Sequence, residues 1–140
     1  MKLKISSALI IILLLFSNIA YSQSVLSKFN ELNTILDQSG CINEFTINET
    51  GQVKIKDDSA GVWSVHFTNI EKSDSLWIDG LFHLVLCLKE NKKMVYKTNH
   101  KTVKNESRLR IAFDDPEKGR KAVAKLHEAI QIGQPRTKGY

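Results

Sequence analysis

Hydrophobic residues first recur at helical spacing, over residues 24–39. An apolar side chain returns every three or four positions, as one face of a helix requires. The residues of that face are Val25, Phe29, Leu32 and Leu36. Ser24 can cap the start of the helix and Gly40 its end. The pattern predicts a short N-terminal helix that must dock its apolar face on another part of the fold.

After Gly40 the hydrophobic period changes to the alternation of half-buried strands. The predicted strands are residues 41–47, 52–56, 62–68, 94–98 and 108–113, with one long or two short strands inside residues 76–88. Residues 48–51, 57–61 and 90–93 have the composition of turns. The polar segments 69–75 and 99–106 are expected to be loops. This gives six or seven antiparallel strands joined in short steps.

Residues 81–88 are nearly all apolar, which is typical of a strand buried on both faces. One face of this strand would carry Phe82, Leu84, Leu86 and Leu88. The other would carry Leu81, His83, Val85 and Cys87. We expect the N-terminal helix to cover the second face.

A second helix is predicted for residues 116–132. Asp115 can cap it, and Pro116 suits the first helical position, where a missing N–H costs no hydrogen bond. Its apolar stripe is Val123, Leu126 and Ile130. Gly119 also falls on the inner side, where glycine costs about 1 kcal/mol relative to alanine. We therefore expect the helix backbone to approach the sheet closely at Gly119.

This order of elements predicts an α+β fold. The sheet would be a curled antiparallel sheet or a small barrel, with the N-terminal helix packed outside it and the second helix closing one end. Three segments carry a resemblance to the pleckstrin-homology-like barrel superfold: residues 63–70, residues 82–86, and residues 110–113 leading into the second helix. The resemblance implies a binding role, since members of that superfold bind peptides, proteins or inositol phosphates. A cystatin-like or lipocalin-like arrangement of the same strands is the alternative.

The first 22 residues have the form of a cleaved signal peptide. Lys2 and Lys4 precede an apolar run over residues 8–16, and Ala20-Tyr21-Ser22 fits a signal-peptidase site. The run is short for a membrane span, so we expect a secreted or periplasmic protein, with residues 23–140 forming one domain and no span after cleavage. Formal charge falls from +5 to +3 when the two lysines are removed, which is only mildly basic.

Two cysteines, Cys41 and Cys87, remain after the signal. An even pair in an oxidising compartment is a candidate disulfide, and its closure would stabilise the fold by roughly 4 kcal/mol on the chain-entropy model. Two free thiols acting as small apolar residues are the other interpretation. No CxxC motif is present, so the spacing indicates neither a redox pair nor a zinc knuckle.

Basic residues concentrate between Lys89 and Arg110, a segment that contains eight lysines and arginines but only two glutamates. The residues proposed to bind an anionic partner are Lys92, Lys93, Lys97, Lys101, Arg108 and Arg110. Such a partner would be an anionic envelope component or another protein. Aromatic residues are not interleaved, which disfavours nucleic acid. The alternative is a solvated face whose lysines keep sheet edges from aggregating.

No catalytic or metal site is predicted. The four histidines, His66, His83, His100 and His127, are widely spaced, and no GxSxG, HExxH or P-loop motif occurs. No cofactor is implied. We therefore expect an exported, non-enzymatic binding module. The alternatives are a carrier whose cavity is lined by Trp63, Phe67, Trp77 and Phe82, and a small hydrolase or metal-dependent enzyme.

Overall fold

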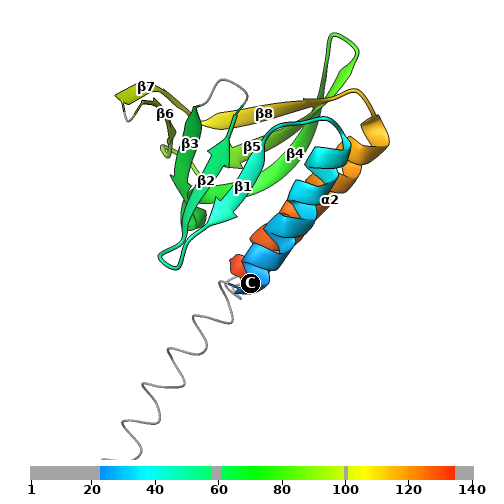
Figure 1. The fold of residues 1–140 in the computed structure, drawn as a ribbon. Helices are drawn as coiled ribbons and strands as arrows, with labels where there is room; N and C mark the ends of the chain where they lie inside the picture. The colour runs from blue at the N-terminus through cyan, green and yellow to red at the C-terminus, as the bar shows by residue number, and fades with distance from the viewer. Residues whose placement is uncertain (1–22, 58–60, 100, 135–140) are drawn as a thin grey trace, which may run out of the picture.

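The computed structural model describes residues 23–57, 61–99 and 101–134, so the predicted signal peptide lies outside the described residues. An N-terminal helix over residues 23–38 precedes eight strands and a C-terminal helix (Figure 1). The strands are β1 (Glu44–Ile47), β2 (Gln52–Lys56), β3 (Val62–His66), β4 (Ile70–Ile78), β5 (Leu81–Leu88), β6 (Met94–Thr98), β7 (Lys101–Glu106) and β8 (Arg108–Phe113). The 3₁₀ turn η1 (Phe67–Asn69) joins β3 to β4, and the last helix is α2 (Pro116–Gly133). The predicted α+β class and both predicted helices are confirmed.

The strands form two open antiparallel sheets. One has the order β1-β2-β3-β6-β7 and the other the order β4-β5-β8. The chain leaves the first sheet after β3 and forms the β4–β5 hairpin in the second sheet. It then returns to the first sheet for β6 and β7 and adds β8 to the second sheet before α2 (Figure 1). Among the described residues β8 pairs with β5 alone. Of the two expected sheet forms, the small closed barrel is wrong, because in the described part of the chain no strand pairing joins the two sheets into a continuous wall.

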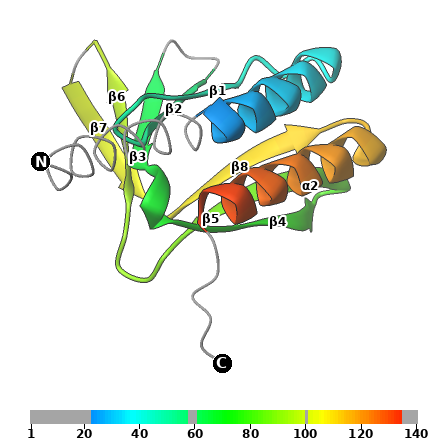
Figure 2. The same cartoon turned by 90° about the horizontal axis from the view of Figure 1, so that it is seen from below.

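Both helices lie on the same side of the three-stranded sheet (Figure 2). The helical residues Phe29, Leu32 and Leu126 share one core with the strand residues Leu84 and Leu86. The N-terminal helix therefore covers the Phe82 face of β5, and our expectation that it covers the Leu81 face is wrong. The strand over residues 81–88 is apolar on both faces, but only the Phe82 face packs against the core. Neither described helix is both long and apolar enough to cross a membrane.

Two polar segments that were expected to be loops are strands. Residues 70–78 form β4, and residues 101–106 form β7, whose side chains are all exposed. Both are edge strands of their sheets. An edge strand needs backbone pairing on one side only, and its polar side chains protect the sheet against aggregation. The sequences of β4 and β7 therefore lack the apolar alternation that identifies a half-buried strand.

Helix α2 begins as its sequence predicts. The Asp115 carboxylate accepts a hydrogen bond from the Glu117 N–H at 3.0 Å, and Pro116 follows the cap. Gly119 is buried, and a Cβ there would lie 2.6 Å from Phe82 Cε1, so the predicted close approach is confirmed. The helix packs along β4, β5 and β8, and does not seal a barrel end.

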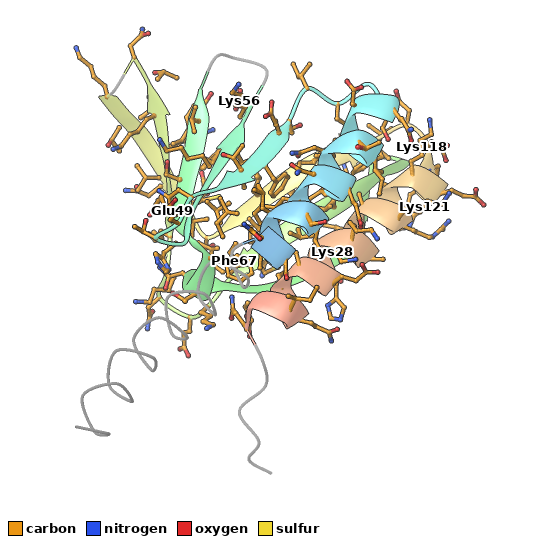
Figure 3. All side chains as sticks on the ribbon, turned by 60° about the horizontal axis from the view of Figure 1, so that its bottom comes forward. Lys28, Glu49, Lys56, Phe67, Lys118 and Lys121 are labelled. Carbon is orange, nitrogen blue, oxygen red and sulfur yellow. The ribbon has the colours of Figure 1, made fainter. Side chains whose placement is uncertain are left out.

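Four charged side chains join the two helices. Lys125 Nζ lies 2.8 Å from Glu31 and 3.1 Å from Glu128, and Lys28 Nζ lies 3.2 Å from Glu128. Lys28 is labelled at this junction in Figure 3. Nearby, Lys118 Nζ donates a hydrogen bond to the Gln38 carbonyl at 3.0 Å. The cluster links the two helices on their solvent-accessible side.

We expect this cluster to lose its stabilising effect in acid. The hydrogen bond from Lys125 lowers the pKa of both Glu31 and Glu128 from 4.5. Because the folded pKa values are depressed, the contribution is fully present above pH 4.5 and is lost as pH falls through the folded values. Urea midpoints measured from neutral pH into acid should therefore fall less steeply for Lys125→Met than for the wild type. Lys121→Met, at an exposed position of α2, is the control, and equal slopes for wild type and Lys125→Met would contradict the prediction.

Candidate functional site

A cleft of about 510 Å³ runs beside β8. It is formed by three segments that are distant in the sequence: the connection from the N-terminal helix to β1, the ends of β2 and β3, and β8 itself. The residues that line it are Ser39, Gly40, Cys41, Ile42, Asn43, Asp57, Trp63, Leu109, Arg110, Ile111, Ala112 and Asp114. The cleft therefore occupies the gap that a closed barrel would have filled with a strand.

The backbone of β8 offers hydrogen-bonding groups to this cleft. In antiparallel pairing, alternate residues direct their N–H and C=O toward the paired strand or away from it. The Ser107 carbonyl accepts from the Leu88 N–H at 3.2 Å, so odd-numbered residues face β5. The Ala112 carbonyl instead accepts a hydrogen bond from the Cys41 thiol at 3.6 Å, so the backbone groups of even-numbered residues face away from β5. Arg108 and Arg110 therefore present their backbone groups along the free edge.

The free edge of β1 is treated differently. Asn33 of the N-terminal helix donates to the Phe45 carbonyl at 2.8 Å and accepts from the Phe45 N–H at 2.7 Å. A single asparagine thus satisfies both outward groups of Phe45, as an added strand would. On β8 the outward carbonyl of Ala112 accepts a weak hydrogen bond from the Cys41 thiol.

The side chains around the cleft are of mixed character. The acidic residues Asp57 and Asp114 line it together with Arg110 and the apolar Ile42, which is 63% exposed. Burial, with a smaller effect from the Asp114 carboxylate, raises the pKa of the Cys41 thiol above 9.0. The thiol therefore stays protonated at neutral pH and is not an activated nucleophile. The cleft is suited to binding an uncharged backbone and a few side chains.

The six basic residues predicted to bind an anion are divided between two sheets. Arg108 and Arg110 direct their side chains to the outer face of the β4-β5-β8 sheet, and Arg110 also lines the cleft. Lys97 lies on the outer face of the other sheet, where β3 separates it from Lys56. The remaining three are Lys92 and Lys93, in the turn before β6, and Lys101, at the start of β7. All six are exposed.

Cys41 and Cys87 are both free. Cys41 lies against Ala112, which pairs with His83, and His83 is four residues from Cys87 along β5. Four residues of strand span about 13 Å, whereas bridged Cα atoms lie within about 7 Å. The register therefore explains why the two thiols are not bridged here.

Three histidines lie in the described part of the chain, on β3, β5 and α2. His66 Nε2 lies 2.8 Å from the Thr50 carbonyl and its Nδ1 lies 2.7 Å from Thr68 Oγ1, so its ring supports the turn before β2. His83 is half-buried on β5, and His100 is outside the described residues. No group of three or more potential metal ligands occurs in the described part of the chain.

The aromatic residues proposed to line a carrier cavity pack against other side chains. The Phe67 ring lies 6.2 Å from Phe29, and the Phe82 ring lies 6.5 Å from Phe113. Trp63 is 5% exposed and contacts Tyr96, with ring centroids 4.7 Å apart, while Trp77 is 53% exposed. Of the four, Trp63 alone is among the residues that line the cleft.

Comparisons with protein-family models, with curated proteins and with solved structures gave no match. The site therefore rests on geometry alone. Sequence reasoning singled out Arg110 and Cys41, but it missed Asn43, Asp57 and the free edge of β8. An edge strand has no local signature here, because β8 alternates as regularly as a central strand would.

Proposed function

We propose that this protein is an exported, non-enzymatic interaction module that binds an extended peptide segment as a fourth strand beside β8. The observation that carries the proposal is the free edge of β8 along an open cleft. Addition of a strand to a sheet edge is a general mode of peptide recognition, in which backbone hydrogen bonds supply affinity. The form of residues 1–22 supports export.

The edge has room for a short segment. Arg108 and Arg110 each present one N–H and one C=O, so a peptide of about five residues would gain up to about four backbone hydrogen bonds. Each contributes about 0.5–1.5 kcal/mol net. Affinity would therefore be modest unless side chains of the peptide also enter the cleft.

Side chains around the cleft suggest which peptides bind. Ile42 offers exposed apolar surface, and Asp114 offers negative charge. A peptide with apolar side chains on one side and a lysine or arginine near Asp114 fits this arrangement. This proposal places the anionic groups on the protein and the cationic group on the ligand, the reverse of the basic-patch interpretation.

The relationship to the pleckstrin-homology-like barrel belongs to the same proposal. Its support is the antiparallel strands followed directly by a C-terminal helix that packs on them. The β4–β5 hairpin leaves the first sheet and the sheets stay open, so the proposed relationship is to an opened variant of that barrel.

Selection from a library of displayed random peptides against residues 23–140 tests the function. Arg110→Pro removes an outward N–H without breaking a bond to β5, and prolines are tolerated on edge strands. We expect it to weaken binding of selected peptides at least tenfold, about 1.4 kcal/mol. Arg110→Ala, the matched control, keeps the N–H and should bind within about threefold of the wild type. Both variants should melt cooperatively. A failure to select any peptide, or equal binding by Arg110→Pro, would overturn the proposal.

A further inference from the structure

The outer face of the β4-β5-β8 sheet carries apolar side chains around the half-buried His83, and both helices lie on the opposite face (Figure 2). Leu76 and Leu81 on this face are 43% and 40% exposed, and Ala112 is also exposed. Val85 lies between Asp74 and Arg110 and lines a hollow of about 220 Å³ together with Leu76, Arg108 and Arg110. This is the second face of the apolar run over residues 81–88.

From His83 onward, each residue of β5 on this face lies between one residue of β4 and one of β8, and we call such a row of three residues a level. At two of these levels the β4 and β8 side chains differ in size or in charge. Leu76 of β4 and the small Ala112 of β8 flank His83. One level further, Asp74 of β4 and Arg110 of β8 flank Val85. A large side chain thus stands level with a small one, and an acid stands level with a base.

We infer that this face pairs with the same face of a second copy, about a two-fold axis parallel to β5. Such an axis places β4 of one copy over β8 of the other and keeps the levels aligned. Leu76 then lies over Ala112 of the second copy, and Asp74 faces Arg110 of the second copy. Because the interface is isologous, each contact occurs twice. This pairing goes beyond the proposed function, and it leaves the outward backbone of β8 free for a peptide.

At the next level along β5, the pairing would bring two positive charges close together. Lys72 and Arg108 flank Cys87, so the axis would bring Lys72 toward Arg108 of the second copy. Lys72 Nζ lies 3.8 Å from the Asp74 carboxylate, which partly compensates its charge. Both are long side chains at the end of the face, where they can extend into water.

The size of the face predicts a weak dimer. Three strands about 4.8 Å apart and about 27 Å long cover about 400 Å². Stable interfaces bury about 800 Å² on each partner, so this association belongs to the transient class. We therefore expect dimers only at high protein concentration.

Sedimentation equilibrium over about 5–500 μM tests the pairing through charge reversal. Asp74→Arg alone and Arg110→Asp alone should each weaken dimerisation at least tenfold. The double variant exchanges the charges and should restore dimerisation to near the wild-type level. Glu49→Arg, which makes the same charge change in the β1–β2 turn (Figure 3), should have no effect. A wild type that stays monomeric throughout, or a double variant that is not restored, would overturn the inference.

Cys87 gives a second readout that is independent of charge. It lies on β5, and therefore on the proposed axis, where packed sheets place the two Cα atoms about 10 Å apart. That distance exceeds the reach of a disulfide, but a short bismaleimide spans it. Cys41→Ser should be cross-linked to a dimer at high concentration, whereas Cys87→Ser should not. The reverse pattern would contradict the axis. Peptide binding at low concentration, where the protein is monomeric, separates this inference from the proposed function.

Discussion

Replacement of Leu126 with aspartate is expected to abolish cooperative folding. Leu126 is completely buried between α2 and the strands of the core. Loss of a buried leucine side chain alone costs about 2–5 kcal/mol. An unpaired buried carboxylate adds a desolvation penalty of several kcal/mol, and the whole fold is stabilised by only about 5–15 kcal/mol.

Thermal and urea unfolding followed by circular dichroism measures this effect. His127→Asp is the matched control, because it introduces the same carboxylate one residue away at an exposed position of α2. The control should melt near the wild-type midpoint. A soluble Leu126→Asp protein with a cooperative transition close to that of the wild type would show that α2 is dispensable for the core.

The second large effect is expected for Gly119→Ala, which should destabilise the fold although helix propensity alone would favour alanine. Alanine in place of glycine inside a helix normally stabilises by about 0.5–1 kcal/mol. Here the added Cβ would meet the Phe82 ring, which is held between Trp77 and Phe113 and lies beneath the Arg120 guanidinium. We expect a net destabilisation of about 1–3 kcal/mol, which is the usual range for overpacking.

Urea titration of Gly119→Ala shows directly whether the substitution lowers or raises the free energy of unfolding. A second substitution, Phe82→Leu, should cost less in the Gly119→Ala background than in the wild type, because the smaller side chain makes room for the new methyl group. Ala124→Gly, at an exposed position of the same helix, should follow propensity and lose about 1 kcal/mol. A Gly119→Ala midpoint above that of the wild type would contradict the close approach.

Local chemistry made the two helices and most of the strands predictable. Asp115 and Pro116 encode the start of α2 with a cap and a fixed backbone angle. Gly119 signalled a close approach because a glycine inside a helix is costly without such a reason. Val53, Ile55, Leu109 and Ile111 alternate because one face of their strands is buried.

What the sequence could not show is how the strands combine. Segments 69–75 and 99–106 looked like loops because edge strands take polar side chains. Nothing in residues 70–88 indicates that the β4–β5 hairpin belongs to a different sheet from β3 and β6, since both arrangements bury the same alternate residues. The cleft depends on that partition, because it brings Asp57 and Trp63 to the free edge of β8. The direction of the Arg110 backbone follows only from the pairing of β8 with β5.

Amide hydrogen exchange on β8, with and without a selected peptide, tests strand addition most directly. In the free protein the amides of Leu109 and Ile111 face β5 and should exchange slowly, while those of Arg108 and Arg110 should exchange quickly. Binding of the peptide should slow exchange at Arg108 and Arg110 and leave Leu109 and Ile111 unchanged. Peptide binding without added protection at Arg108 and Arg110 would contradict the account.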